Sequence, residues 1–276
     1  MTLPIRAGAA ALALISAALS GAAAQATTLE VTVENTAQAG GFSFTPLYVA
    51  FQNGSFDAFD PGSVASPGLE ALAEVGQPAT IAAERQVIAP NSQGAVLPGL
   101  AVGAPGPVDP GETASVTVDV DGSANPFFTF LAMLLPSNDT FFGVEDPLTH
   151  RLFDTAGQFV GTTVIDVTGT NLYDAGTEVN DPADGAAFVA GVDATQGTVE
   201  GGLVRKATSL AAFAGAVTPL GPLDGSQIDF LSSPDAFSIA RITIREVTAP
   251  VPLPAGAVML MGGLAALGGL GLRRRA

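Results

Sequence analysis

The chain has 276 residues, with 26 acidic and 10 basic side chains, one histidine and no cysteine or tryptophan. The lack of cysteine excludes disulfides, zinc–thiolate centres and cysteine nucleophiles, and a net charge of −16 argues against a nucleic-acid partner, since phosphates need cations to neutralise them. A hydrophobic content of 47% is enough for a core, whereas 33 glycines, 20 prolines and 13% charged residues favour strands joined by turns.

The first 26 residues have the three parts of a secretory signal peptide. Arg6 provides a positive charge, residues 9–19 are apolar, and residues 24–26 form a small-x-small cleavage site. The mature chain is therefore expected to begin near Thr27. Residues 27–250 carry all 26 acidic side chains, so we predict an exported, strongly acidic domain.

Strand patterns dominate residues 27–250. Alternating apolar and polar residues, typical of half-buried strands, or short apolar runs occur at 29–33, 42–44, 47–51, 115–120, 160–167 and 240–245. Residues 127–135 are almost continuously apolar, which predicts a central strand buried on both faces. A helix is predicted from Pro67, with Ser66 as its N-cap and Gly76 at its end, and a weaker helical pattern spans residues 203–213. We therefore predict an all-β fold, one antiparallel β-sandwich with one or two short helices.

Acidic loops interrupt the strand pattern after residue 135, after residue 172 and at residues 119–122. Calcium binds about 6–8 hard oxygen ligands, and Gly176 allows a turn that brings the acids at 174 and 178 together. Asp139 would add a third carboxylate from a neighbouring strand end. The sequence thus offers Asp139, Asp174 and Glu178 as candidate metal ligands, with solvated acidic turns as the alternative. Residues 119–122 are better explained as a turn between strands.

The last 26 residues have the pattern of a C-terminal sorting signal. Val-Pro-Leu-Pro-Ala at residues 251–255 precedes an apolar run at residues 257–272 and three arginines at residues 273–275. Sixteen helical residues span about 24 Å, slightly less than a bilayer core. The tail (residues 251–276) resembles the V-P-L-P-A variant of bacterial PEP-CTERM sorting signals. That resemblance implies an exosortase-type processing peptidase, a membrane-anchored precursor with its domain outside, and a Gram-negative host; a plain C-terminal anchor is the alternative.

Further segments occur in an order that resembles the spondin N-terminal domain of F-spondin, mindin and bacterial exported proteins. They are residues 52–57, 65–74, 135–139, 142–144, 173–178 and 239–244. The resemblance implies an eight-stranded antiparallel β-sandwich with calcium bound in loops at one end. Carried over by motif, the ligands implied are Asp139, from Pro-Ser-x-Asp, with Asp174 and Glu178, where Glu replaces the Asp usual in animal members. Glu145 and Asp181 are more simply explained as solvated acids.

Enzymatic alternatives have little support in the sequence. His150 is the only histidine, no Gly-x-Ser-x-Gly motif occurs, and Asp-Ala-Gly at 174–176 has no second copy to form an aspartic-protease pair. We therefore expect a non-enzymatic, calcium-binding spondin-type module at the cell surface or in the extracellular matrix, with an unknown glycan or protein ligand. The alternatives are a secreted hydrolase that uses the acidic loops, with Asp139 and Asp174 as an acid pair, and a metal-free structural matrix protein.

Overall fold

The computed structural model describes residues 26–100 and 106–247. The expected signal peptide, apart from Ala26, and the expected tail with its membrane-spanning segment at 257–272 lie outside the described residues. Among the residues that are described, no helix has the length and apolar character needed to cross a membrane.

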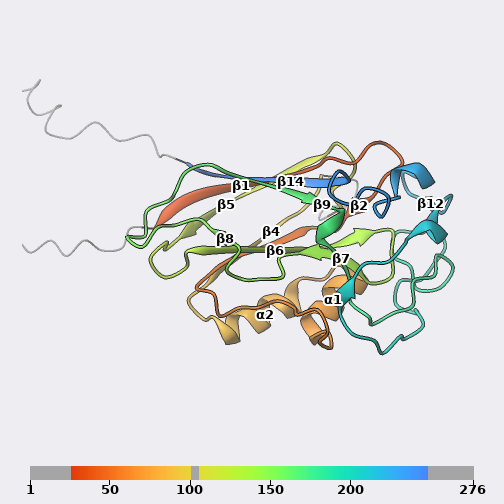
Figure 1. Ribbon diagram of the computed structural model, residues 1–276, viewed down its shortest axis with the longest axis horizontal. Helices are drawn as coiled ribbons and strands as arrows, with labels where there is room; N and C mark the ends of the chain where they lie inside the picture. Colours follow the sequence, from red (N-terminus) through yellow and green to blue (C-terminus); the bar gives the residue numbers. More distant parts are fainter. Residues whose placement is uncertain (1–25, 101–105, 248–276) are drawn as a thin grey trace, which may run out of the picture.

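Two antiparallel sheets pack face to face (Figure 1). The first contains β5 (Thr113–Val120), β1 (Thr27–Asn35), β14 (Ser238–Glu246) and β9 (Thr163–Thr168), in that order. The second runs in the order β11 (Arg205–Lys206), β10 (Leu172–Asp174), β7 (Thr140–Gly143), β6 (Phe127–Leu135), β3 (Leu47–Gln52) and β4 (Gln93–Leu97). The two-residue strands β2 (Ser43–Phe44) and β8 (His150–Arg151) also pair with β6. The predicted antiparallel β-sandwich is confirmed.

Short elements complete the described chain. β12 (Val217–Thr218) pairs with β13 (Gly221–Pro222), and three 3₁₀ turns are η1 (Gly169–Asn171), η2 (Ala211–Phe213) and η3 (Gly225–Gln227). The prediction of a helix at residues 203–213 is wrong, because that segment contains strand β11 and the 3₁₀ turn η2. Strand pairing with β10 takes residues 205 and 206 into the sheet despite their local pattern.

The four-stranded sheet has one buried and one solvated face. Leu29, Val31 and Val33 of β1 are buried, whereas polar residues alternate with them along the strand. On the other sheet, Phe128, Phe130 and Phe142 enter the same core from β6 and β7. The large aromatic content of the chain is therefore explained by the space between the two sheets.

Both faces of the eight-stranded sheet are covered. Leu131 of β6 and Phe141 of β7 point away from the main core and pack beneath the helices α1 (Pro67–Val75) and α2 (Ala79–Ile88). Figure 1 shows the two helices along the outer side of this sheet. The prediction that residues 127–135 form a strand buried on both faces is confirmed, and the helices are its physical reason.

Helix α1 begins and ends as the sequence predicts. The Ser66 hydroxyl accepts a hydrogen bond from the Leu69 N–H (3.1 Å), and Gly76 ends the helix in the left-handed conformation (φ +65°). Helix α2 was not predicted, and it begins without a side-chain cap. Its Glu84 carboxylate accepts bonds from the Ser66 hydroxyl and the Gly68 N–H (2.7 Å each), so α2 completes the capping of α1.

We predict that Gly76→Ala destabilises the domain more than Gly111→Ala. Both glycines have positive φ (+65° and +79°), which costs an alanine about 1 kcal/mol. At Gly76 the new methyl group would also lie 2.3 Å from the Thr45 side chain, whereas at Gly111 nothing lies within 4 Å. This overlap adds about 1–3 kcal/mol. Equal losses in chemical denaturation would show that α1 does not pack tightly against β2 and its neighbours.

Candidate metal centre

Asp139 lies in the turn between β6 and β7, and the structure fixes this turn through its side chains. The Ser137 hydroxyl donates to the Leu134 carbonyl (2.6 Å). Asn138 reaches across to the loop after β10, donating to the Asp184 carbonyl (2.6 Å) and accepting from the Asp181 N–H (3.0 Å). The Pro-Ser-Asn-Asp turn therefore acts as a clamp on the loop that follows Asp174.

The Asp139 carboxylate is fully buried and has two unlike oxygens. Its Oδ2 accepts hydrogen bonds from the backbone N–H groups of Thr177 (2.8 Å) and Glu178 (3.1 Å). Its Oδ1 is buried and has no hydrogen-bond partner among the described residues. A buried carboxylate oxygen without a partner costs free energy unless a cation or a water binds it.

Asp174 is the last residue of β10, and its carboxylate is also fully buried. Its side chain accepts from the Gly176 N–H (2.9 Å) and from the Asn180 amide (3.1 Å). Gly176 has φ +71°, and a Cβ there would lie 2.7 Å from backbone atoms of Leu203. Only glycine fits this turn, which folds the chain back over Asp174 as the sequence predicts.

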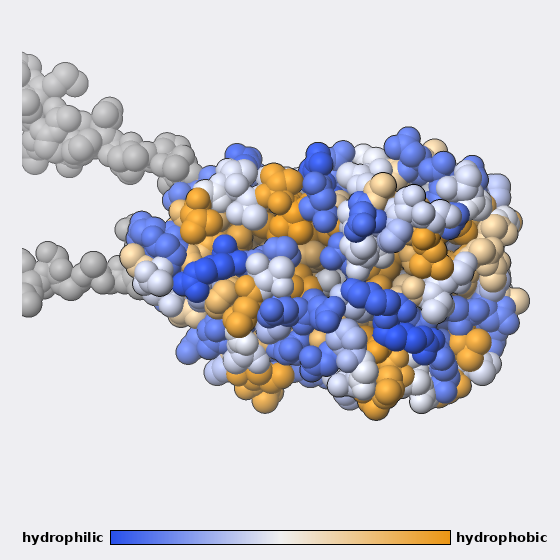
Figure 2. Space-filling view, in the orientation of Figure 1, coloured by the Kyte–Doolittle hydropathy of each residue, from blue (hydrophilic) through white to orange (hydrophobic). Residues whose placement is uncertain are grey.

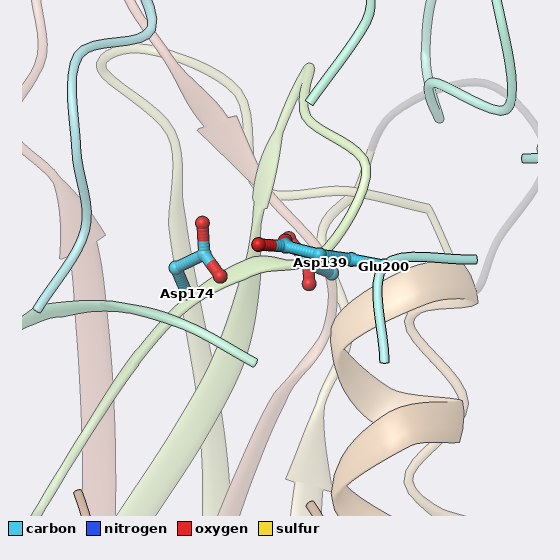
Figure 3. A group of neighbouring side chains, drawn as sticks. All are labelled: Asp139, Asp174 and Glu200. Carbon is cyan, nitrogen blue, oxygen red and sulfur yellow. The ribbon is translucent and has the colours of Figure 1, made fainter. Parts of the chain in front are cut away.

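Asp139, Asp174 and Glu200 each offer a carboxylate oxygen within 4.8 Å of the others. Figure 3 shows the three side chains converging from separate segments, with a helix beside them. The structure thus brings Asp139 and Asp174 close together, and their role as metal ligands stays a prediction. Three oxygens at this spacing fit the shared coordination shell of one divalent cation.

The structure assigns Glu178 a different environment from the one expected. Its backbone N–H donates a hydrogen bond to Asp139. Its carboxylate packs against Gly185 and Gly197 and is not one of the three converging groups. The Asn138 amide donates to it at 3.5 Å, and the side chain is buried. Glu178 is therefore placed beside the centre rather than in it.

Glu200 was missed by sequence reasoning. It lies in an irregular loop 26 residues after Asp174 and belongs to no motif. Backbone bonds bring it to the centre: the Glu200 N–H donates to the Thr177 carbonyl (2.8 Å), and the Gly202 N–H donates to the Gly176 carbonyl (2.7 Å). Nothing in the local sequence signals this pairing.

The other acids considered lie outside the centre. The Tyr173 hydroxyl donates to Glu145 (2.7 Å), and Lys206 lies 3.7 Å from the same carboxylate. Asp181 accepts from the Ala183 N–H (2.8 Å), and Asp121 accepts from the Ser123 N–H (3.0 Å) in the turn after β5. These carboxylates are used by local turns and pairs.

A comparison with protein families identifies the domain. The model of the spondin N-terminal domain family, Spondin_N, matches residues 36–198, which is more than half of the chain. The chain belongs to this family. Membership indicates an extracellular module of the matrix type. No curated protein sequence matches the chain.

The spondin domain extends in space beyond the matched residues. Strands β1 and β14 both lie wholly outside residues 36–198, yet they pair with each other in the middle of the four-stranded sheet. Side chains from Leu29 to Ile244 share one hydrophobic core. Glu200 also lies beyond the matched segment, whereas Asp139 and Asp174 lie within it.

The electrostatics of the spondin domain's centre favour a cation. Burial, and then the nearby Asp139 charge, raise the pKa of Asp174 to about 6. Burial also raises the pKa of Asp139, against the effect of the backbone N–H groups that bind it. Burial, and then the Glu74 charge, raise the pKa of Glu178 to about 7. A divalent cation would offset the desolvation and the repulsion that cause these shifts, because its charge stabilises the ionised carboxylates.

We predict that the metal-free domain loses stability as the pH rises from about 4 to about 7. A pKa raised in the folded state means that the folded protein binds more protons than the unfolded chain in this range, so ionisation of Asp174 opposes folding. Burial lowers the pKa of His150, which acts in the opposite sense. The measurement is therefore the melting temperature of the wild type minus that of Asp174→Asn, in chelator.

This difference should become less favourable to the wild type as the pH rises. Asp121→Asn serves as the control, because Asp121 lies in a surface turn away from the centre, and its difference from the wild type should stay constant. A wild-type advantage over Asp174→Asn that grows with pH would contradict the raised pKa of Asp174.

Proposed function

We propose that the domain is a non-enzymatic, calcium-binding spondin-type module that is exported to the cell surface or extracellular matrix. Two observations carry this proposal: the Asp139, Asp174 and Glu200 carboxylates converge, and the buried Asp139 Oδ1 has no hydrogen-bond partner among the described residues. The oxygen-only donor set fits calcium, which prefers carboxylates, carbonyls and water. The ion would stabilise the fold by joining the β6–β7 turn to the loops after β10 and before β11.

The same observation argues against the hydrolase alternative. Glycosidases place their two carboxyl groups roughly 5–9.5 Å apart across an open cleft so that a sugar and water fit between them. Here the carboxylate oxygens lie within 4.8 Å, and the side chains of Asp139 and Asp174 are both fully buried. Buried aspartates at this spacing support binding of a cation better than catalysis on a polymer.

Binding of a glycan or protein at the same end of the domain is the second part of the proposal. Loops beside the centre expose aliphatic side chains, with Val199 80% and Val64 74% exposed. Residues 62–64 lie against residue 204 through the Gly62–Val204 and Val204–Ser63 backbone bonds. Figure 2 shows hydrophobic residues interspersed with hydrophilic ones on the face that it presents.

The predicted signal peptide and C-terminal sorting signal would both attach at one end of the sandwich. The first and last described segments meet at one end of the sandwich, where the Val247 N–H donates to the Thr28 carbonyl (2.9 Å). The centre lies at the opposite end: Leu135 pairs with Ser43, and the carbonyl of Phe42 accepts a bond from the Asn35 side chain at the far end of β1. With a C-terminal anchor retained before exosortase-type processing, this arrangement would point the centre away from the membrane.

We predict that calcium raises the melting temperature of the domain. Free calcium at about 100 times the Kd adds about 2.7 kcal/mol, which corresponds to about 5–10 °C for a domain of this size. Asp139→Asn and Asp174→Asn should each lower the calcium affinity at least about tenfold because each removes a ligand charge. Asp121→Asn should respond like the wild type. The absence of any shift at millimolar calcium would leave the metal-free structural protein as the better explanation.

We further predict that Glu200→Gln weakens calcium binding about tenfold, whereas Glu178→Gln changes the Kd less than about threefold. Both substitutions replace a carboxylate by an amide of the same size, but only the Glu200 carboxylate converges with the two aspartates. Calorimetric titration of both variants provides the comparison. The reverse order would show that Glu178 is the third carboxylate ligand and that Glu200 is not.

A further inference from the structure

Arg205 places a cation of the chain itself against the proposed calcium centre. Its guanidinium Nη2 donates to Asp174 (3.1 Å) and to Glu200 (3.0 Å), and its Nη1 lies 2.9 Å from the other Glu200 oxygen. Two of the three converging carboxylates are therefore bridged by one guanidinium group. Charge-assisted bonds of this kind are strong and directional.

Strand pairing fixes the backbone of Arg205, whereas its side chain has a route to solvent. Arg205 of β11 is directly opposite Asp174 of β10. Its side chain is 40% exposed, compared with 1% for the side chain of Asp174. The guanidinium can therefore leave the carboxylates by rotation of its own side chain, without movement of either strand.

The carboxylates do not need to move for this exchange. Backbone bonds from Glu200 and Gly202 to the turn at residues 176–177 hold the loop that carries Glu200. The N–H groups of Thr177 and Glu178 hold Asp139 through its Oδ2. Its Oδ1 has no hydrogen-bond partner among the described residues. Arg205 thus pairs with Asp174 and Glu200 but makes no hydrogen bond to this buried oxygen of Asp139.

We propose that Arg205 is a tethered competitor of calcium, which calcium displaces when it binds, and that this competition sets the affinity and the charge selectivity of the centre. The proposal rests on the calcium-binding function proposed above. A divalent ion attracts each carboxylate with twice the charge of the guanidinium and also binds Asp139 Oδ1. A monovalent ion such as sodium has no charge advantage over Arg205 and must also lose its water.

The consequence is a lower apparent affinity for calcium than the carboxylates alone would give. The centre binds calcium only in the fraction of molecules whose guanidinium has left, and the apparent Kd rises in inverse proportion to that fraction. A purely structural Arg205 predicts the opposite effect. If the guanidinium only held the acidic loops together, its removal would loosen the ligands and weaken calcium binding.

Calorimetric titration of the purified full chain and its Arg205→Gln variant with calcium chloride separates these two roles. We expect the Kd of the variant to be at least tenfold lower than that of the wild type. The matched control is Arg241→Gln, which removes an exposed arginine paired with Asp166 (2.7 Å) on the four-stranded sheet and should leave the Kd unchanged. An unchanged or higher Kd for folded Arg205→Gln would overturn the proposal.

Selectivity gives a second readout on the same proteins. When choline chloride is replaced by sodium chloride at equal ionic strength, the calcium Kd of Arg205→Gln should rise at least threefold, because sodium enters the vacated position. The Kd of the wild type should stay constant. Equal responses of the two proteins would overturn the role of Arg205 in charge selectivity.

The wild type alone provides a test that does not depend on the folding of a variant. In ¹⁵N spectra, the assigned Nε–Hε resonance of Arg205 should move toward the position of a solvated arginine on saturation with calcium. A resonance that stays in place while calcium binds would overturn displacement and leave the calcium function intact. If neither the wild type nor the variant binds calcium, both proposals fail.

Discussion

The hydrogen bonds from the backbone N–H groups of Thr177 and Glu178 to Asp139 Oδ2 are the interaction on which the rest of the centre depends. They join the turn between two core strands to the loop after β10. Because the Asp139 carboxylate is thereby held inside the protein, its second oxygen is committed to a buried position without a partner. The same bonds hold the loop after β10 against the β6–β7 turn, where the Asp139 carboxylate lies close to those of Asp174 and Glu200. The turn at the end of β6 therefore determines both the local fold and the local charge.

The sandwich explains why such a costly group persists. β6 carries aromatic residues into the main core on one face and Leu131 beneath the helices on the other. A strand packed from both sides cannot rotate or slide without exposing one of these layers. The turn that follows it is consequently held in position by contacts far from the acidic residues. Burial of the aspartates is enforced by apolar packing, and the resulting repulsion favours an ion.

The parts of this structure that could be predicted are those with a local signal. Alternation predicted β1 and β14, the continuous apolar run predicted β6, and Ser66 with Gly76 predicted the ends of α1. α2 has no such signal, because the residues that it buries are Ile81 and Arg85. The Arg85 guanidinium is held by the Tyr48 hydroxyl (2.7 Å) and the Ser92 carbonyl (2.8 Å), partners that only the tertiary structure provides.

In the candidate metal centre, too, only the residues with a local sequence signal could be predicted. Asp139 and Asp174 lie in short motifs at strand ends, and both fall within the segment that matches the Spondin_N family. Glu178 lies in one of these motifs, but the backbone there directs its N–H group to Asp139 and its carboxylate toward Gly197. Glu200 and Arg205 follow the matched segment and reach the centre through pairing across the sheet edge. The motif therefore supplies the two buried aspartates, whereas the residues that adjust the charge around them come from a loop whose position only the completed sheet determines.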